Sequence, residues 1–185
     1  VPGGPLTPAT AAAVIAAGQP EGAIVVDEGL TFSADYVAAA ASAPRHTYLG
    51  VTGGAIGQGL PCAAGAALAC PDRPVLAVQA DGSGMYTVQA LWTHAREGLD
   101  VTTLVCANGS YRILLEELRR AGVEDPGAEA RGLTGLGEPP LDWVALAQGM
   151  GVPGARAATA EDLADALARA LREPGPHLVE MALAA

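Results

Sequence analysis

The chain contains no lysine, and its 185 residues include only one phenylalanine and three cysteines. All ten positive charges are therefore arginines, and against twenty acidic residues they leave a formal net charge of −10 at pH 7. Nucleic-acid-binding proteins need clustered cations, so this charge argues against a nucleic-acid partner. No apolar run of about 18 residues occurs without a charge, proline or glycine, so we expect no membrane-spanning helix.

The three cysteines, Cys62, Cys70 and Cys106, have neither the spacing of a metal site nor an even count. Each lies in an apolar run, which favours buried free thiols in a reducing compartment. The N-terminus lacks a positive stretch followed by an apolar one, so we predict no secretory signal. Together these features predict a cytoplasmic protein.

Half of the residues are hydrophobic but only 4% are aromatic, so the core must consist of Ala, Val, Leu and Ile. Residues 1–6 begin at Val1 and are rich in proline and glycine, which suggests the remnant of a linker from a longer chain. We interpret residues 7–185 as one domain, because neither an internal repeat nor a second linker interrupts them.

Short apolar runs alternate with alanine-rich or amphipathic stretches along this domain. The runs of strand length are 23–26, 48–51, 75–80, 101–106 and 177–183. The expected helices are 7–17, 33–42, an alanine-rich helix ending near residue 70, one that follows residue 84 with Trp92 on its buried face, 111–121, 142–150, and one capped by Thr159. Residues 122–140 read as a long loop. This alternation predicts an α/β fold: a doubly wound, mainly parallel sheet of about six strands with helices on both faces.

Two polar loops follow neighbouring strands of this sheet. Asp81 comes directly after strand 75–80, and Asn108 follows strand 101–106 by one residue. In parallel sheets such loops meet at the carboxyl ends, where ligands bind. A carboxylate, an amide oxygen and a carbonyl from the turn 108–110 suit Mg²⁺, and Gly82 and Ser83 open a helix whose amides, with the Ser83 hydroxyl, can face a phosphate. Equally, the residues fit a helix-capping turn and a simple Asn-Gly turn, so spacing alone leaves both readings open.

Three motifs together resemble thiamine-diphosphate-dependent enzymes. Ala-Asp-Gly-Ser at 80–83, a stretch of 24 residues (83–106), and Ala-Asn-Gly-Ser-Tyr at 107–111 are similar to the family fingerprint of Gly-Asp-Gly, a gap of this size, and Asn-Asn. The glycine-rich segment 53–61 resembles that of acetolactate synthases and benzoylformate decarboxylases. The resemblance extends from about residue 5 to residue 181, and it implies the diphosphate-binding domain of such an enzyme.

Carried over residue by residue, the resemblance implies Asp81 and Asn108 as side-chain ligands of Mg²⁺ and the carbonyl of Ser110 as a third. The fingerprint departs from the family at Ala80 and Ala107, neither of which is an implied side-chain ligand. Arg112 stands where these relatives often have glycine, and it either contacts the diphosphate or points to solvent.

The remaining implied cofactor contacts lie in other loops. Thr31 resembles a diphosphate-binding hydroxyl, and Tyr111 is expected close to the diphosphate. Ile56 corresponds to the apolar wedge that bends the cofactor, and Gly54 to the carbonyl that receives the aminopyrimidine amino group. A bent cofactor brings its own base to the carbon that must lose a proton.

The resemblance implies half of the active site of a 2-oxo acid decarboxylase or an acetolactate-synthase-like carboligase. In this family a glutamate from a separate pyrimidine-binding domain activates the cofactor, and nothing here resembles that domain. We therefore expect the chain to be inactive without it, whether it belongs to the same longer chain or to a separate subunit, and we expect a homodimer or tetramer.

Three alternatives remain from the sequence: a subunit of a two-chain sulfopyruvate or phosphonopyruvate decarboxylase, a non-catalytic cofactor-binding or regulatory domain, and a general nucleotide-binding module. The particular 2-oxo acid, and the choice between decarboxylation and carboligation, are not encoded in these motifs. Asp27 and Glu28 are expected to face solvent or a backbone amide, and His46, His94 and His177 to be solvated or structurally satisfied.

Overall fold

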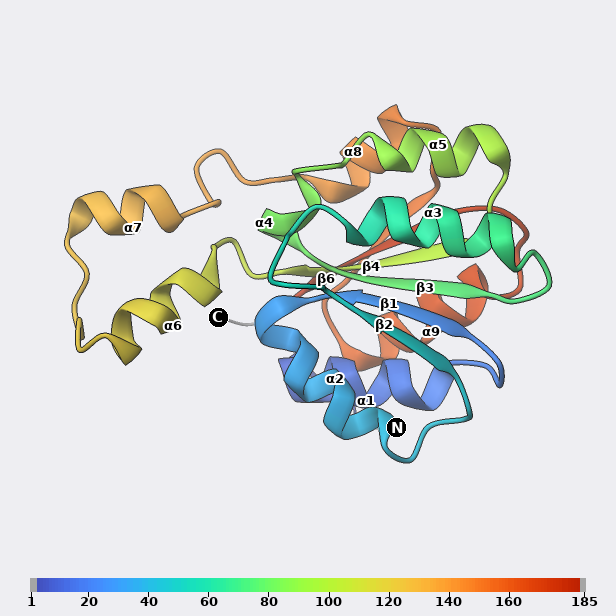
Figure 1. Ribbon diagram of the computed structural model, residues 1–185, viewed down its shortest axis with the longest axis horizontal. Coiled ribbons are helices and arrows are strands. Elements are labelled where there is room, and N and C mark those ends of the chain that lie inside the picture. Colours follow the sequence, from blue (N-terminus) through green and yellow to red (C-terminus); the bar gives the residue numbers. More distant parts are fainter. Residues whose placement is uncertain (1–2, 184–185) are drawn as a thin grey trace.

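Residues 3–183 are described by a computed structural model, in which six parallel strands form one sheet in the order β2-β1-β3-β4-β6-β5 (Figure 1). The strands are β1 (Ile24–Glu28), β2 (Thr47–Gly50), β3 (Val75–Ala80), β4 (Val101–Ala107), β5 (Gly154–Ala157) and β6 (His177–Ala182). The chain moves from β1 to β2 on one side and then to β3 on the other. The predicted doubly wound α/β fold is therefore confirmed.

Helices cover both faces of the sheet. One face carries α1 (Pro8–Gly18), α2 (Ser33–Ala40) and α9 (Ala160–Ala170), and the other carries α3 (Gly59–Ala69), α5 (Ala90–Glu97) and α8 (Trp143–Gly149). Two single turns, η1 (Leu30–Phe32) and α4 (Asp81–Gly84), follow β1 and β3. The remaining helices, α6 (Arg112–Arg120) and α7 (Ala128–Thr134), extend away from the sheet as an arm (Figure 1).

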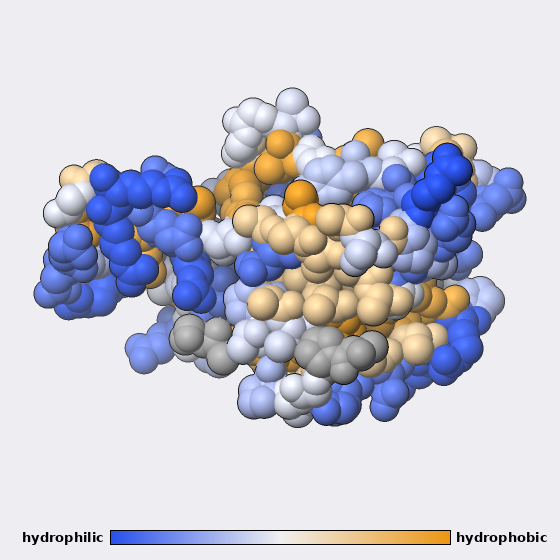
Figure 2. Space-filling view, turned by 90° about the horizontal axis from the view of Figure 1, so that it is seen from below, coloured by the Kyte–Doolittle hydropathy of each residue, from blue (hydrophilic) through white to orange (hydrophobic). Residues whose placement is uncertain are grey.

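Alternation along the strands builds two separate cores. In β1, Val25 packs among α1, α2 and α9, whereas Ile24 and Val26 pack among α3, α5 and α8. Every residue of β1 and β3 is buried, because both strands lie inside the sheet and are covered on both faces. Figure 2 shows the face of α1 and α2, whose outward alanines and the half-exposed Val37 give it an apolar surface, while the arm beside it is largely hydrophilic.

The structure corrects three expectations about elements. Residues 122–140 were expected to be one loop, but Ala128–Thr134 form α7, a helix whose residues are nearly all exposed and so show no apolar periodicity. The sixth strand, β5, lies at the sheet edge and lacks an apolar run, so it was not located in advance. The helix expected to follow residue 84 begins only at Ala90, after a stretch of turns.

Two expectations about burial are also wrong. Trp92 is 53% exposed and lies under the guanidinium of Arg96, whose central carbon is 4.8 Å from the ring centre. The buried face of α5 is formed by Leu91 and His94 instead. Of the three thiols expected in the core, only Cys106 is buried, whereas Cys62 is exposed.

The N-terminal segment is attached to the domain. Leu6 is buried in the core, and its amide donates to the carbonyl of Ala158 at 3.2 Å. The residue belongs to the domain, although the predicted linker remnant of residues 1–6 included it. The predicted linker begins at residue 1 and the predicted domain ends at residue 185. Residues 1–2 and 184–185 lie outside the described residues. Among residues 3–183, no helix has the length and apolar character needed to cross a bilayer.

His94 joins the helices of one face. Its Nε2 lies 3.0 Å from the carbonyl oxygen of Leu60 and must carry the proton, because a carbonyl only accepts. The ring is fully buried, and this burial lowers the pKa of His94 below its usual 6.5. The folded state therefore favours the neutral form of the His94 ring.

We predict that His94 makes stability depend on pH. Its pKa is lower in the folded state than in the unfolded state, so its contribution is complete above pH 6.5 and is lost as pH falls below that value. Below pH 6.5 the free energy of unfolding should fall by up to about 1.4 kcal/mol per pH unit through this group. Urea unfolding of wild type and His94→Gln at pH 7.5 and 5.5 tests this, and equal pH dependence in both proteins would contradict it.

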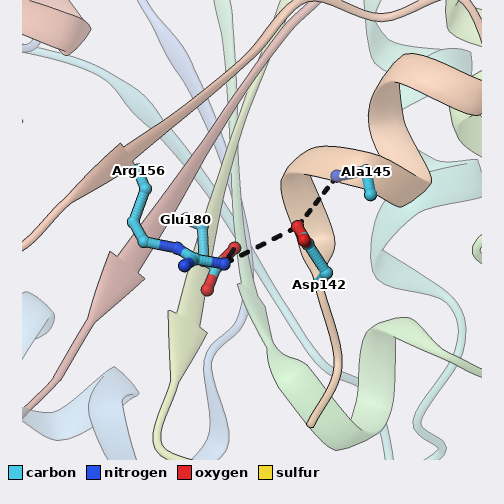
Figure 3. A network of polar contacts seen from close by, with 4 residues as sticks. All are labelled: Asp142, Ala145, Arg156 and Glu180. Atoms are coloured by element: carbon cyan, nitrogen blue, oxygen red, sulfur yellow. Dashed lines mark hydrogen bonds and ion pairs between the residues drawn. The ribbon is translucent and has the colours of Figure 1, made fainter.

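A polar network links the sheet edge to α8 (Figure 3). The Arg156 guanidinium of β5 donates to Glu180 of β6 at 3.1 Å and lies 3.6 Å from Asp142, which accepts the amide of Ala145 at 2.9 Å as the α8 cap. The Glu180 side chain is only 7% exposed, so Arg156 is the partner of a nearly buried carboxylate.

Arg156→Ala should lower the free energy of unfolding by about 1–2 kcal/mol, because it leaves the nearly buried Glu180 carboxylate without its charged partner. The loss stays moderate because water screens the exposed arginine. Arg131→Ala is the matched control, since Arg131 pairs with Asp125 where both side chains are exposed. That change should stay within about 0.5 kcal/mol. Equal losses in the two variants, measured by urea unfolding, would show that burial of Glu180 is unimportant.

Candidate functional site

The polar loops meet at the carboxyl ends of β1, β3 and β4, beside the point where the chain reverses direction between β1 and β3. A small pocket of about 20 Å³ there adjoins a hollow of about 160 Å³, and the two share Thr31, Asn108 and Arg112. The smaller pocket is also lined by Asp81, Gly82, Ser83, Ser110 and Tyr111. The structure therefore brings together all the residues that the sequence implied for the metal and the diphosphate.

Asp81 is the central side chain of this pocket. It is 3% exposed; its Oδ1 accepts the amide of Gly82 at 2.9 Å, and its Oδ2 accepts those of Asn108 at 3.0 Å and Gly109 at 2.8 Å. Burial raises the pKa of the carboxyl, and these amide donors partly offset the rise. No arginine or histidine among residues 3–183 forms an ion pair with Asp81. A bound cation would compensate the buried charge.

Asn108 presents an oxygen beside this carboxylate. Its Oδ1 accepts the amide of Ser110 at 3.0 Å and lies 3.2 Å from the Ser110 hydroxyl. The Asn108 side chain thereby closes the turn of residues 108–110. Gly109 completes the turn with a φ of +69°, which favours glycine. The Oδ1 of Asp81 accepts a single amide and retains acceptor capacity, whereas its Oδ2 already accepts two amides. The Asn108 oxygen retains capacity when the Ser110 hydroxyl donates elsewhere.

The donor set fits a hard divalent cation. No group of three or more His, Cys, Asp or Glu side chains suited to a metal occurs within residues 3–183, so a metal at this pocket would bind one carboxylate together with amide and carbonyl oxygens. Mg²⁺ accepts such a small protein set, because it shares its octahedral positions with phosphate oxygens and water. The residues present therefore fit the implied ion.

Ser83 does not point its hydroxyl at this pocket. The residue is 1% exposed, and its Oγ lies 3.2 Å from the carbonyl of Ala80 and 3.3 Å from that of Glu28, to either of which it can donate, while it accepts from the Gln79 side chain at 2.7 Å. The expectation that this hydroxyl faces a phosphate is therefore wrong. At this position only the backbone of Ser83 remains available to a ligand.

Gly54 and Ile56 lie outside the pocket, in the glycine-rich loop (residues 51–58) between β2 and α3. Gly54 is exposed, with a φ of +66°, and Ile56 is half-buried. The loop is joined to the pocket elements by the Thr87 hydroxyl, which donates to the carbonyl of Gly57 at 2.9 Å. The implied wedge and the implied metal ligands thus lie on different loops, and only the implied ligands line the pocket.

Several residues at the site were missed or set aside by sequence reasoning. Glu28 is buried rather than solvated, and it accepts backbone amides of the glycine-rich loop, which was one of the two expected outcomes. Leu30, which lines the pocket, is the one non-glycine residue within 3–183 with a positive φ, 54°, and such strain often occurs at ligand sites. Arg112 lines both hollows. Two consecutive acids at the end of an apolar strand were the signal that could have identified Glu28.

A larger hollow of about 370 Å³ lies at the opposite end of the sheet, before the strands begin, and is lined by residues such as Arg73 and Asp100. In open α/β sheets ligands bind beyond the carboxyl ends of the strands. The hollow also contains none of the residues that the sequence singled out. We therefore place the functional site at the smaller pocket.

Comparison with known proteins shows the family of this chain. The family described as "thiamine pyrophosphate enzyme, C-terminal TPP binding domain" matches residues 31–181. The acetolactate synthase large subunit-like protein IlvX of Mycobacterium tuberculosis is 52% identical over 98% of this chain and 35% of its own length. Benzoylformate decarboxylase of Pseudomonas aeruginosa is 37% identical over 97% of this chain and 33% of its own.

Among solved structures, the thiamine diphosphate-dependent 4-hydroxybenzoylformate decarboxylase of Rhodococcus jostii RHA1 superimposes with a TM-score of 0.85 and 33% identity. The match covers 97% of this chain and 33% of that one. The chain thus spans about a third of the length of the relatives that it matches.

Gly82→Ala should distort the pocket, because a Cβ at this position would clash with the Tyr111 ring. We expect the free energy of unfolding to fall by about 1–3 kcal/mol through overpacking. In a Tyr111→Ala background the same glycine change should have little effect, since the ring that it strikes is gone. Urea unfolding of the two single variants and the double variant measures this coupling, and additive losses would argue against the close contact.

Proposed function

Because this chain belongs to the thiamine pyrophosphate enzyme family and forms its TPP-binding domain, we propose that it binds the diphosphate of thiamine diphosphate through Mg²⁺ and supplies half of the active site of an enzyme acting on 2-oxo acids. The reaction is decarboxylation or an acetolactate-synthase-like carboligation. Relatives named for each reaction match the chain over nearly its whole length.

The observation that carries the proposal is the position of Asp81. Its carboxylate is buried between two strand-end loops, accepts three backbone amides and pairs with no arginine or histidine of residues 3–183. A charge in that environment is costly unless an ion compensates it. Asp81, the Asn108 side chain and the Ser110 carbonyl supply oxygens to Mg²⁺, and the ion in turn holds the diphosphate.

Residues of the pocket and of the glycine-rich loop would orient the bound cofactor. The Thr31 hydroxyl and the backbone of Gly82 and Ser83 would contact the diphosphate, with the Tyr111 ring beside it. In the glycine-rich loop, the Ile56 side chain would support the cofactor rings and the Gly54 carbonyl would receive the aminopyrimidine amino group. When bound, thiamine diphosphate supplies a nucleophilic carbon and an electron sink for the 2-oxo acid.

The chain should need a partner to complete the reaction. It spans about a third of its curated relatives. Among residues 3–183, Glu116 is the only glutamate that lines either hollow, and that hollow contains neither Gly54 nor Ile56, so the glutamate expected to activate the aminopyrimidine ring has to come from elsewhere. We propose that a pyrimidine-binding domain, on the same longer chain or on a separate subunit, supplies this glutamate and contacts the substrate. The active form is then a homodimer or tetramer, and residues 1–185 alone do not turn over substrate.

Asp81→Asn should weaken Mg²⁺-dependent binding of thiamine diphosphate by about a hundredfold, or roughly 2.7 kcal/mol, because it removes the charged ligand but keeps the side-chain shape. Isothermal titration calorimetry with Mg²⁺ and with EDTA measures this loss. Asp35→Asn is the control, since Asp35 lines the neighbouring hollow but is not an implied ligand. Unchanged affinity in Asp81→Asn, or equally tight binding of Mg²⁺-ATP by the wild type, would count against the proposal.

A further inference from the structure

Glu28 is a second buried carboxylate, at the end of β1. It is 1% exposed, and its Oε1 accepts the amide of Gly57 at 2.9 Å and the side-chain amide of Gln79 at 2.6 Å. Its Oε2 accepts the amide of Gly59 at 2.8 Å. No arginine or histidine of the described chain pairs with it. Its partners are therefore two backbone groups flanking Gln58 and one neutral side chain.

The two glycines are shaped for this contact. Gly57 has a φ of +96°, and its carbonyl accepts the Thr87 hydroxyl, so its amide and its carbonyl are both held. A Cβ on Gly59 would lie 2.6 Å from the Gln79 side-chain oxygen and 3.0 Å from the Cβ of Glu28. Only glycine lets the backbone come this close to the carboxylate.

A carboxylate is the side chain that these contacts require. All three partners donate, and an ionised carboxylate only accepts, so it can satisfy all three. A glutamine at this position would turn its own N–H donors towards at least one of them. A buried charge without a cation is costly. Two of the three donors to Glu28 are the amides of Gly57 and Gly59, so the carboxylate fixes the end of the loop that carries Gly54 and Ile56.

We propose that Glu28 is the positioning residue of the glycine-rich loop, setting the Gly54 carbonyl and the Ile56 side chain against the diphosphate pocket. The inference rests on the proposed function insofar as these two residues contact the cofactor. Only Gly29 separates Glu28 from η1, which contains Thr31, and the carbonyl of Glu28 lies 3.3 Å from the Ser83 hydroxyl. Glu28 therefore contacts both the glycine-rich loop and the α4 turn.

Hydrogen exchange measured by mass spectrometry on the whole chain without cofactor tests the positioning directly. In Glu28→Gln, exchange over residues 52–60 should accelerate about ten- to a hundredfold, because charge-assisted bonds to Gly57 and Gly59 are lost. Asp27→Asn is the matched control: Asp27 is also buried in β1, but it bonds to Gly29, Ser33 and Tyr48. Its removal should leave exchange over residues 52–60 unchanged.

Ligand binding provides a second readout. With Mg²⁺ present, Glu28→Gln should weaken thiamine diphosphate about tenfold but inorganic pyrophosphate hardly at all, because pyrophosphate occupies only the diphosphate pocket, where Glu28 has no direct contact. A merely structural role would weaken both ligands equally. Glu28→Asp keeps the charge but is one methylene shorter, so it should show an intermediate acceleration of exchange.

If Glu28→Gln does not fold, Glu28→Asp decides by the same exchange measurement. Unchanged exchange over residues 52–60, or equal weakening of the two ligands, would overturn the positioning role. Failure of the wild-type chain to bind thiamine diphosphate with Mg²⁺ would instead overturn the proposed function. The exchange experiment still decides the role of Glu28 in that case, since it uses no ligand.

Discussion

Backbone amides donated to buried carboxylates hold the functional end of this domain together. Asp81 at the end of β3 accepts three amides, two of them from the loop after β4, and Glu28 at the end of β1 accepts two from the loop after β2. Loops rich in glycine lose much conformational entropy on ordering, so strong acceptors are needed to fix them. Each carboxylate thus fixes a loop belonging to a neighbouring strand.

Burial of these charges shows that the site is not arranged for stability alone. The raised pKa of Asp81 reflects a charged form that the apo protein tolerates poorly, and Leu30 adds a strained backbone beside it. Both features lie at the pocket, whereas the two cores on either side of the sheet consist of close-packed aliphatic side chains. Such a division is expected when a rigid scaffold carries a preorganised ligand site.

The sequence was sufficient for the scaffold and for the polar residues that gather at the small pocket. The run Val75–Ala80 is uniformly apolar, so strand β3 was predicted with its observed bounds, and the strand-end rule placed Asp81 beside Asn108. The direction of the Ser83 hydroxyl and the role of Glu28 were not predictable in the same way. Both depend on contacts with Gln79, which is 51 residues from Glu28 and carries no motif. Helix α7 was not predicted because it buries only Thr134 and therefore has no apolar periodicity in its sequence.

The arm formed by α6 and α7 begins and ends at the turn of residues 108–110. The Tyr111 amide donates to the carbonyl of Thr134 at 2.8 Å, and the Leu136 amide donates to that of Gly109 at 2.8 Å, so the excursion is closed at its base. Doubling the length of a closed loop costs only about 0.6 kcal/mol. Residues 117–133, which line neither hollow, can therefore lengthen, shorten or be replaced during evolution while residues 108–110 at the root keep their places, which makes this excursion a natural site for diversification within the family.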